Sequence, residues 1–152
     1  MQKKIVFTGG TGRFGEVFKT IKSKNKIFFP KKKQLNIENF KSIKIYLNKI
    51  KPSYLIHAAA LSRPMEIHEK NINKSIDINI IGTANIVKAC QEENIKLIYF
   101  STHYVYPGKK GNYSEKDPVL PFNNYSISKL GGECSVQMYS NSLILRICMT
   151  EK

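Results

Sequence analysis

Tyr125 and Lys129 are the two residues whose types and spacing best fit proton-transfer chemistry. They lie four positions apart in a segment with helical periodicity, so their side chains share one helix face. A lysine ammonium beside a phenol favours the phenolate and lowers the pKa of the tyrosine. The pair therefore predicts a general acid or base that moves a proton to or from a carbinol oxygen. Thr102 stands at the end of an expected strand, and its hydroxyl could hold the same oxygen.

A glycine-rich turn near the N-terminus predicts a bound nucleotide that takes part in this chemistry. Gly9, Gly12 and Gly15 follow a short apolar stretch at residues 4–7 and precede apolar residues at helical spacing. Glycine permits the tight turn and the close approach of a pyrophosphate, which a dinucleotide site between a strand and a helix requires. An ordinary glycine-rich turn is the alternative, and the strand–turn–helix context favours nucleotide binding.

The stretch after the second expected strand bears on the choice of cofactor. Residues 26–29 run into Pro30, Lys31 and two further lysines, with no acidic residue to grip a ribose 2′-hydroxyl. Basic residues at this place accept the 2′-phosphate of NADP, and Arg13 in the glycine turn adds to the same charge. A solvated lysine run is the alternative. The sequence therefore predicts NADP(H), with NAD(H) as the second choice.

Strand and helix patterns alternate along the whole chain. Strands are expected at residues 4–7, 26–29, 54–60, 95–100 and 143–148, and helices from about residue 14, at 37–50, at 72–93 and at 124–139. This alternation predicts an α/β fold: a Rossmann-like, doubly wound parallel sheet with helices on both faces. Small residues at positions 58–60, where the third strand ends, leave room for a flat ligand, although simple helix–sheet packing explains them equally well.

Composition limits the class of protein. The 152 residues, 41% hydrophobic, suffice for one domain with a core, and no stretch resembles a membrane span or signal peptide. The three cysteines are odd in number and show no metal-ligand spacing, so we expect reduced thiols, no metal site and a cytoplasmic location. The net charge of +14 raises nucleic acid as a partner, which we discount because basic and aromatic residues do not alternate.

Taken together, the motifs resemble the extended short-chain dehydrogenase/reductase superfamily, the NAD-dependent epimerase/dehydratase group. Within it the sequence is most similar to the dTDP-4-dehydrorhamnose reductases and related nucleotide-sugar reductases. The residues that carry the resemblance are the glycine turn and positions 57–60, 77–83, 100–108, 113–117 and 124–133, in family order.

The resemblance implies roles for individual residues. It makes Thr102, Tyr125 and Lys129 the catalytic group and Tyr104 a substrate contact. The residues implied to bind the cofactor are Gly9, Thr11, Gly12, Arg13, Phe14, Gly15, Lys31, Asn36, Ile37, Ala58, Ala59, Ala60, Asn79, Tyr125 and Lys129.

The resemblance also implies a further region, because members of the family continue into a substrate-binding part. We therefore expect residues 1–152 to be the NAD(P)-binding Rossmann domain, truncated after about five strands, without the C-terminal substrate-binding region. The expected activity is NADP(H)-dependent reduction of a 4-keto sugar nucleotide. The alternatives are a nucleotide-sugar epimerase or dehydratase, or a non-catalytic NAD(P)-binding subunit. The expected protein partner is a second copy of the chain or a chain that supplies the missing region.

Overall fold

The computed structural model describes residues 2–148 and contains one five-stranded parallel sheet. The strands are β1 (Lys4–Thr8), β2 (Lys26–Phe28), β3 (Tyr54–His57), β4 (Lys96–Thr102) and β5 (Ser142–Ile147). The helices are α1 (Arg13–Lys19), α2 (Phe40–Ile50), α3 (Ile67–Lys70), α4 (Ile72–Ser75), α5 (Gly82–Glu92) and α6 (Asn124–Gln137). A π-helical segment, Ile76–Ile81, joins α4 to α5, and a 3-10 turn, His103–Val105, follows β4.

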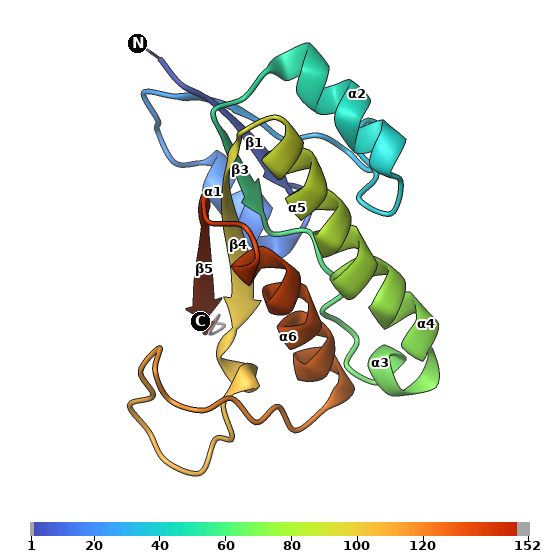
Figure 1. Cartoon of the computed structure of the whole chain (residues 1–152), viewed down its shortest axis with the longest axis vertical. Coiled ribbons are helices and arrows are strands. Elements are labelled where there is room, and N and C mark those ends of the chain that lie inside the picture. The colour runs from blue at the N-terminus through green and yellow to red at the C-terminus, as the bar shows by residue number, and fades with distance from the viewer. Residues whose placement is uncertain (1, 149–152) are drawn as a thin grey trace.

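Helices cover both faces of the sheet, as expected (Figure 1). Val6 and Phe7 show the two faces, because neighbouring residues of a strand point in opposite directions. Val6 belongs to a core shared with residues of α2, α5 and α6, whereas the ring of Phe7 stacks on Phe14 and Phe18 of α1. The predicted Rossmann-like, doubly wound fold is therefore confirmed.

The strand order β2-β1-β3-β4-β5 fixes where a ligand can bind. The chain leaves β1 in one direction, to reach β2, and builds the rest of the sheet in the other. The place where the strand order reverses, between β1 and β3, is called the switch point of the sheet. The connections after β1 and β3 leave in opposite directions there, so a crevice opens at the carboxyl ends of these strands, and open sheets of this kind bind ligands in it. The glycine turn follows β1, at this place.

The glycine turn lies directly against the end of β3. A Cβ atom at Gly9, where φ is +79°, would lie 2.7 Å from the carbonyl carbon of Ala58. At Gly15, the first buried residue of α1, a Cβ would lie 2.5 Å from the Cα of Gly10. Both distances are shorter than atomic contact allows, so glycine at these two positions lets the backbones of β1, α1 and β3 meet.

The predicted helix at 72–93 is present, but it is not a regular α-helix throughout. In the π-helical segment Ile76–Ile81, the buried Asn79 binds the backbone N–H and C=O of Leu61 at 2.8 and 2.9 Å. Its amide also donates to the hydroxyl of Ser128 on α6, at 2.9 Å. The wider helical turn thus allows a polar side chain on the core face to bind both the loop after β3 and α6.

Other boundaries differ from the sequence prediction for local reasons. The helix expected at 37–50 begins at Phe40, because the side chain of Asn39 accepts the N–H of Ser42 and caps it there. The third strand ends at His57, so residues 58–60 form the start of a loop. The short helix α3 and the 3-10 turn were not predicted, since segments of three or four residues show no periodicity.

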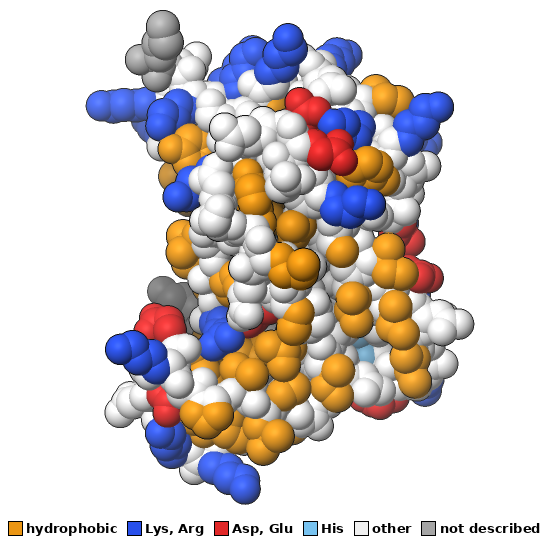
Figure 2. Space-filling view, in the orientation of Figure 1, with side chains coloured by type: hydrophobic (Ala, Val, Ile, Leu, Met, Phe, Trp, Pro, Cys, Tyr) orange, Lys and Arg blue, Asp and Glu red, His pale blue; other side chains and the backbone are white. Residues whose placement is uncertain are grey.

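Charge and apolar side chains are unevenly spread over the face shown in Figure 2. Lysine and arginine gather over the amino-terminal end of the sheet and over α2, whereas apolar side chains gather over the lower part, where α4 and α6 lie. The exposed apolar residues of these lower helices include Ile72 and Ile127. On this face, basic side chains do not form a single stripe.

The tight contact at Gly15 predicts a large cost for one added methyl group. We expect Gly15→Ala to lower the free energy of unfolding by about 1–3 kcal/mol, because the glycine turn must move away from α1. Gly111→Ala is the matched control, since a Cβ there meets no atom within 4 Å. Chemical denaturation of both variants measures the difference, and equal stability would show that the contact is unimportant.

Candidate active site

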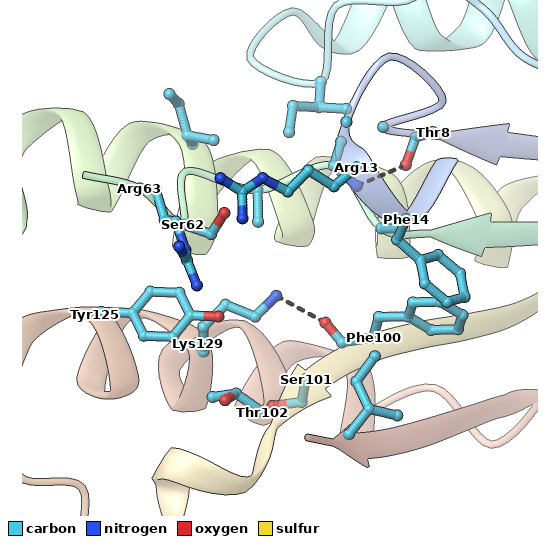
Figure 3. Close-up of a pocket in the computed structure, with 18 of the residues that line it drawn as sticks. Thr8, Arg13, Phe14, Ser62, Arg63, Phe100, Ser101, Thr102, Tyr125 and Lys129 are labelled. Atoms are coloured by element: carbon cyan, nitrogen blue, oxygen red, sulfur yellow. Dashed lines mark hydrogen bonds between the residues drawn. The ribbon is translucent and has the colours of Figure 1, made fainter. Parts of the chain in front are cut away.

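A cleft of about 1710 Å³ runs along the carboxyl ends of the strands. It brings together most residues that the sequence singled out. Those on its wall are Gly9, Thr11, Gly12, Arg13, Phe14, Asn36, Ile37, Ala58, Ala59, Ala60, Thr102, Tyr104, Tyr125 and Lys129. The glycine turn and the loop after β2 form one end of the cleft, and β4 with α6 form the other (Figure 3).

Three predicted cofactor residues, Gly15, Lys31 and Asn79, are absent from the cleft wall. Gly15 is buried behind the turn, where it packs on Gly10. Lys31 is exposed, and its backbone N–H binds the side chain of Gln34. Asn79 supports the wall from behind through Leu61. The structure thus places Gly15 and Asn79 behind the wall and Lys31 on the surface, and their roles toward a cofactor stay predictions.

Tyr125 lies at the start of α6, where a capping box fixes the helix. Asn123 accepts the N–H of Ser126 at 2.8 Å, and the Ser126 hydroxyl accepts the N–H of Asn123 at 3.3 Å. The phenol of Tyr125 points into the cleft, between Arg63 and Thr102, beside Lys129 (Figure 3). Thr102 is the last residue of β4, so the end of a strand and the first turn of a helix bring the two hydroxyl groups together.

Lys129 is buried beneath this pair. Its ammonium donates to the carbonyl of Phe100 at 2.8 Å and lies 4.2 Å from the centre of the Tyr99 ring. Burial lowers the pKa of Lys129 to about 7, although the negative charge of Glu133 acts in the opposite direction. The group therefore changes protonation near neutral pH.

The electrostatics of Tyr125 differ from the sequence prediction. Burial raises the pKa of Tyr125, and the groups that favour its phenolate are the Thr102 hydroxyl and the guanidinium of Arg63. The prediction that Lys129 lowers this pKa is wrong in net direction, because burial outweighs the favourable charges. Arg63 was missed by sequence reasoning, since it lies in the irregular loop after β3.

The segment around α3 supports Tyr125 from behind. The ring of His68, which is fully buried, lies 5.2 Å from the ring of Tyr125, and its Nδ1 is 2.8 Å from the Ser75 hydroxyl. Next to it, a carboxylate oxygen of Glu69 accepts the N–H of Asn124 at the start of α6. These contacts hold the first turn of α6 against α3. They were not predicted, because α3 is too short to leave a sequence signal.

An ion pair anchors α6 to β5. Glu133, which is fully buried, accepts two hydrogen bonds from Nε of Arg146 and one from Nη2 at 2.8 Å. Arg146 also donates to the hydroxyl of Tyr106, at 2.8 Å. Because Glu133 lies one helical turn after Lys129, the pair fixes the rotation of α6 and hence the position of the buried lysine.

At the other end of the cleft, a lysine and a glutamate face the space next to Asn36 and Ile37. Lys32 and Glu38 line the wall and form an ion pair with each other. The sequence pointed to lysines here, and the structure identifies Lys32 as the one on the cleft wall. Glu38 was missed because it follows the lysine run by several residues. This end therefore carries both a positive and a negative group.

Comparison with known proteins assigns the family. A family model described as the RmlD substrate binding domain matches residues 3–150. The chain belongs to this family. The dTDP-4-dehydrorhamnose reductase of Bacillus anthracis, solved in complex with NADP, superposes with a TM-score of 0.89 at 29% identity, covering 96% of this chain and 53% of that one. The corresponding reductase of Clostridium acetobutylicum gives 0.84 at 31% identity, covering 94% and 52%.

Curated relatives include a protein of a different kind. Subunit beta of methionine adenosyltransferase 2 from Rattus norvegicus is 28% identical over 143 residues, which cover 88% of this chain and 42% of that protein. The spore coat polysaccharide biosynthesis protein SpsK of Bacillus subtilis is 28% identical over 147 residues, covering 94% and 52%. The chain thus spans about half the length of the relatives it matches.

Two features of residues 2–148 bear on other classes of site. Within residues 2–148, none of the helices combines the length and apolar character that crossing a bilayer requires. In the same part of the chain, His, Cys, Asp and Glu side chains do not form a group of three or more placed to share a metal ion.

The lowered pKa of Lys129 predicts a pH dependence of stability. Between pH 7 and 10.5 the unfolded lysine holds a proton that the folded one has released, so the free energy of unfolding rises with pH. The contribution of Lys129 to this slope is at most about 1.4 kcal/mol per pH unit. Lys129→Met removes it, and denaturant titrations of both proteins across this window measure the difference. Parallel pH curves would contradict the buried, neutral lysine.

Proposed function

We propose that this chain is the cofactor-binding and catalytic part of an NADP(H)-dependent nucleotide-sugar oxidoreductase that reduces a 4-keto sugar nucleotide. The observation that carries the proposal is the shared cleft: Thr102, Tyr125 and Lys129 line one end, and the glycine turn lines the other. Similarity to dTDP-4-dehydrorhamnose reductases, one of them solved with NADP, supports the same class of reaction.

The residues of the cleft fit a nicotinamide dinucleotide. Gly9, Gly12 and Arg13 of the glycine turn line the cleft, and glycine at position 9 accommodates the positive φ of the turn. Ala58, with only a methyl side chain, leaves space beside the turn. When bound, the cofactor supplies the hydride for the reduction.

The residues of this chain handle the proton. Thr102 donates a hydrogen bond to the substrate carbonyl and positions it, and Tyr125 gives its phenolic proton to the same oxygen as the hydride arrives at carbon. Arg63 and Thr102 stabilise the phenolate that remains. Lys129 holds the floor of the site through Phe100 and binds the nicotinamide ribose, as in the family it resembles. Tyr104, which lines the cleft beside Tyr125, contacts the sugar.

NADP(H) is the cofactor we propose, with Arg13 and Lys32 as the groups that meet the 2′-phosphate. Both line the cleft, and Lys32 extends from the loop after β2 where that phosphate would lie. Glu38 opposes this choice, because its carboxylate lies on the same wall and suits the 2′-hydroxyl of NAD(H). The ion pair between Lys32 and Glu38 offsets the two charges, so a direct comparison of both cofactors is required.

A second candidate function is a non-catalytic, nucleotide-binding subunit. Similarity to subunit beta of methionine adenosyltransferase 2, which reaches 88% of this chain, favours it. In that case a second polypeptide would carry the activity, and the cleft would serve to bind a nucleotide. Turnover of a 4-keto sugar nucleotide by the purified chain alone would exclude this candidate.

Tyr125→Phe tests the proton-transfer step. We expect it to abolish the oxidation of NADPH by a 4-keto sugar nucleotide, because phenylalanine has no proton to give, while NADPH binding stays within about twofold. Absorbance of NADPH measures turnover, and nicotinamide fluorescence measures binding. Tyr113→Phe, in the loop after β4 and away from the cleft wall, is the matched control and keeps its activity. Turnover retained by Tyr125→Phe would remove this residue from the mechanism.

Titration with NADPH and NADH tests the choice of cofactor. We expect tighter binding of NADPH, and we expect Lys32→Ala to weaken it by about tenfold while leaving NADH unchanged, because only NADPH carries the 2′-phosphate. Lys33→Ala, a neighbouring exposed lysine absent from the cleft wall, serves as the control. Equal or tighter binding of NADH would assign the ribose to Glu38 instead.

A further inference from the structure

The cleft holds a second pair of reactive side chains, Cys148 and His103, outside the residues assigned to proton transfer. His103 comes directly after β4, and Cys148 comes directly after β5. These strands are parallel neighbours with Thr102 opposite Ile147, so the two residues emerge side by side at the carboxyl edge of the sheet. The Sγ of Cys148 lies 3.9 Å from the Nε2 of His103.

The hydrogen bond on the other side of the imidazole determines which nitrogen is basic. Nδ1 of His103 lies 3.4 Å from the carbonyl oxygen of Ile147. A carbonyl oxygen only accepts hydrogen bonds, so Nδ1 carries the proton of the neutral ring, and Nε2 presents its lone pair to the thiol. A nucleophile, a base within reach of it and a third group that orients the base form the arrangement typical of an activated nucleophile.

The other two cysteines lack this arrangement. Cys134 is exposed on α6 and Cys90 is buried in the core between α5 and the sheet. Among the described cysteines, Cys148 therefore combines exposure, a histidine neighbour and a position on the cleft wall. On the neighbouring strand β4, the buried hydroxyl of Ser101 lines the same cleft and has no hydrogen-bond partner among the described residues.

We propose that Cys148 is a base-assisted thiol that takes small carbon electrophiles, such as α-halo carbonyl compounds. The Sγ atom forms a bond to the electrophilic carbon as the carbon–halogen bond breaks and halide leaves. The proton of the thiol passes to Nε2 of His103, which releases it to water. The resulting thioether lies on the wall beside Thr102 and Tyr104, so the adduct occupies space at the end of the cleft where the carbonyl substrate would bind.

Alkylation of the full chain by iodoacetamide at pH 7, followed residue by residue with mass spectrometry, tests the proposal. We expect Cys148 to react at least about tenfold faster than Cys134, because general-base assistance accelerates proton transfer by that much or more. His103→Phe keeps an aromatic ring against Tyr104, 4.3 Å away between centres, but removes the base. It should bring the rate of Cys148 to within about twofold of Cys134.

The remaining cysteines serve as internal controls. Cys90 is fully buried, so its lack of alkylation shows that each protein is folded during the reaction. If His103→Phe exposes Cys90, His103→Asn replaces it as the variant without a base. Equal rates of Cys148 and Cys134 in the unsubstituted chain would overturn the proposal, as would an unchanged rate at Cys148 in a folded His103 variant. The measurement requires neither NADPH nor a sugar nucleotide, so its outcome is independent of the proposed reductase activity.

Discussion

The close contact between the glycine turn and the end of β3 is the constraint on which the rest of the site depends. At Gly9 the two backbones approach so closely that a side chain would overlap Ala58. Because β1 and β3 are adjacent at the switch point of the sheet, this contact forms the floor of the crevice. A side chain at Gly9 would meet the backbone of Ala58 and Ala59 and push the turn away from the end of β3. Glycine at this position therefore shapes the crevice by letting the two backbones meet.

Proton transfer and structural support are carried by different residues at the other end of the cleft. Thr102 and Tyr125 are brought together because β4 ends where α6 begins, and the contacts of α3 and Glu133 fix α6 in that position. Burial that secures this geometry also raises the pKa of Tyr125, so nearby cations and hydroxyl groups must favour its phenolate. The same burial makes the charged form of Lys129 costly.

The sequence predicted the fold and most of the cleft because those features depend on local patterns. Strand and helix periodicity located the elements, and glycine spacing located the turn between β1 and α1. What it missed depends on tertiary contacts. Arg63 lies in the loop after β3, and His68 lies in the short helix α3, which contacts α6. Glu38 lies just before Asn39, the residue that caps α2. Burial, which reversed the direction predicted for Tyr125, is likewise invisible in a list of residues.

The π-helical segment has a consequence for insertions and deletions. A turn with bonds from i to i+5 holds one residue more than an α-helical turn, so α4 and α5 are out of phase by one position along a continuous axis. Removal of a single residue between Ile76 and Ile81 would restore the regular period and rotate Asn79 away from Leu61. The length of this helix, and not only its composition, is thus part of what shapes the wall beside Tyr125.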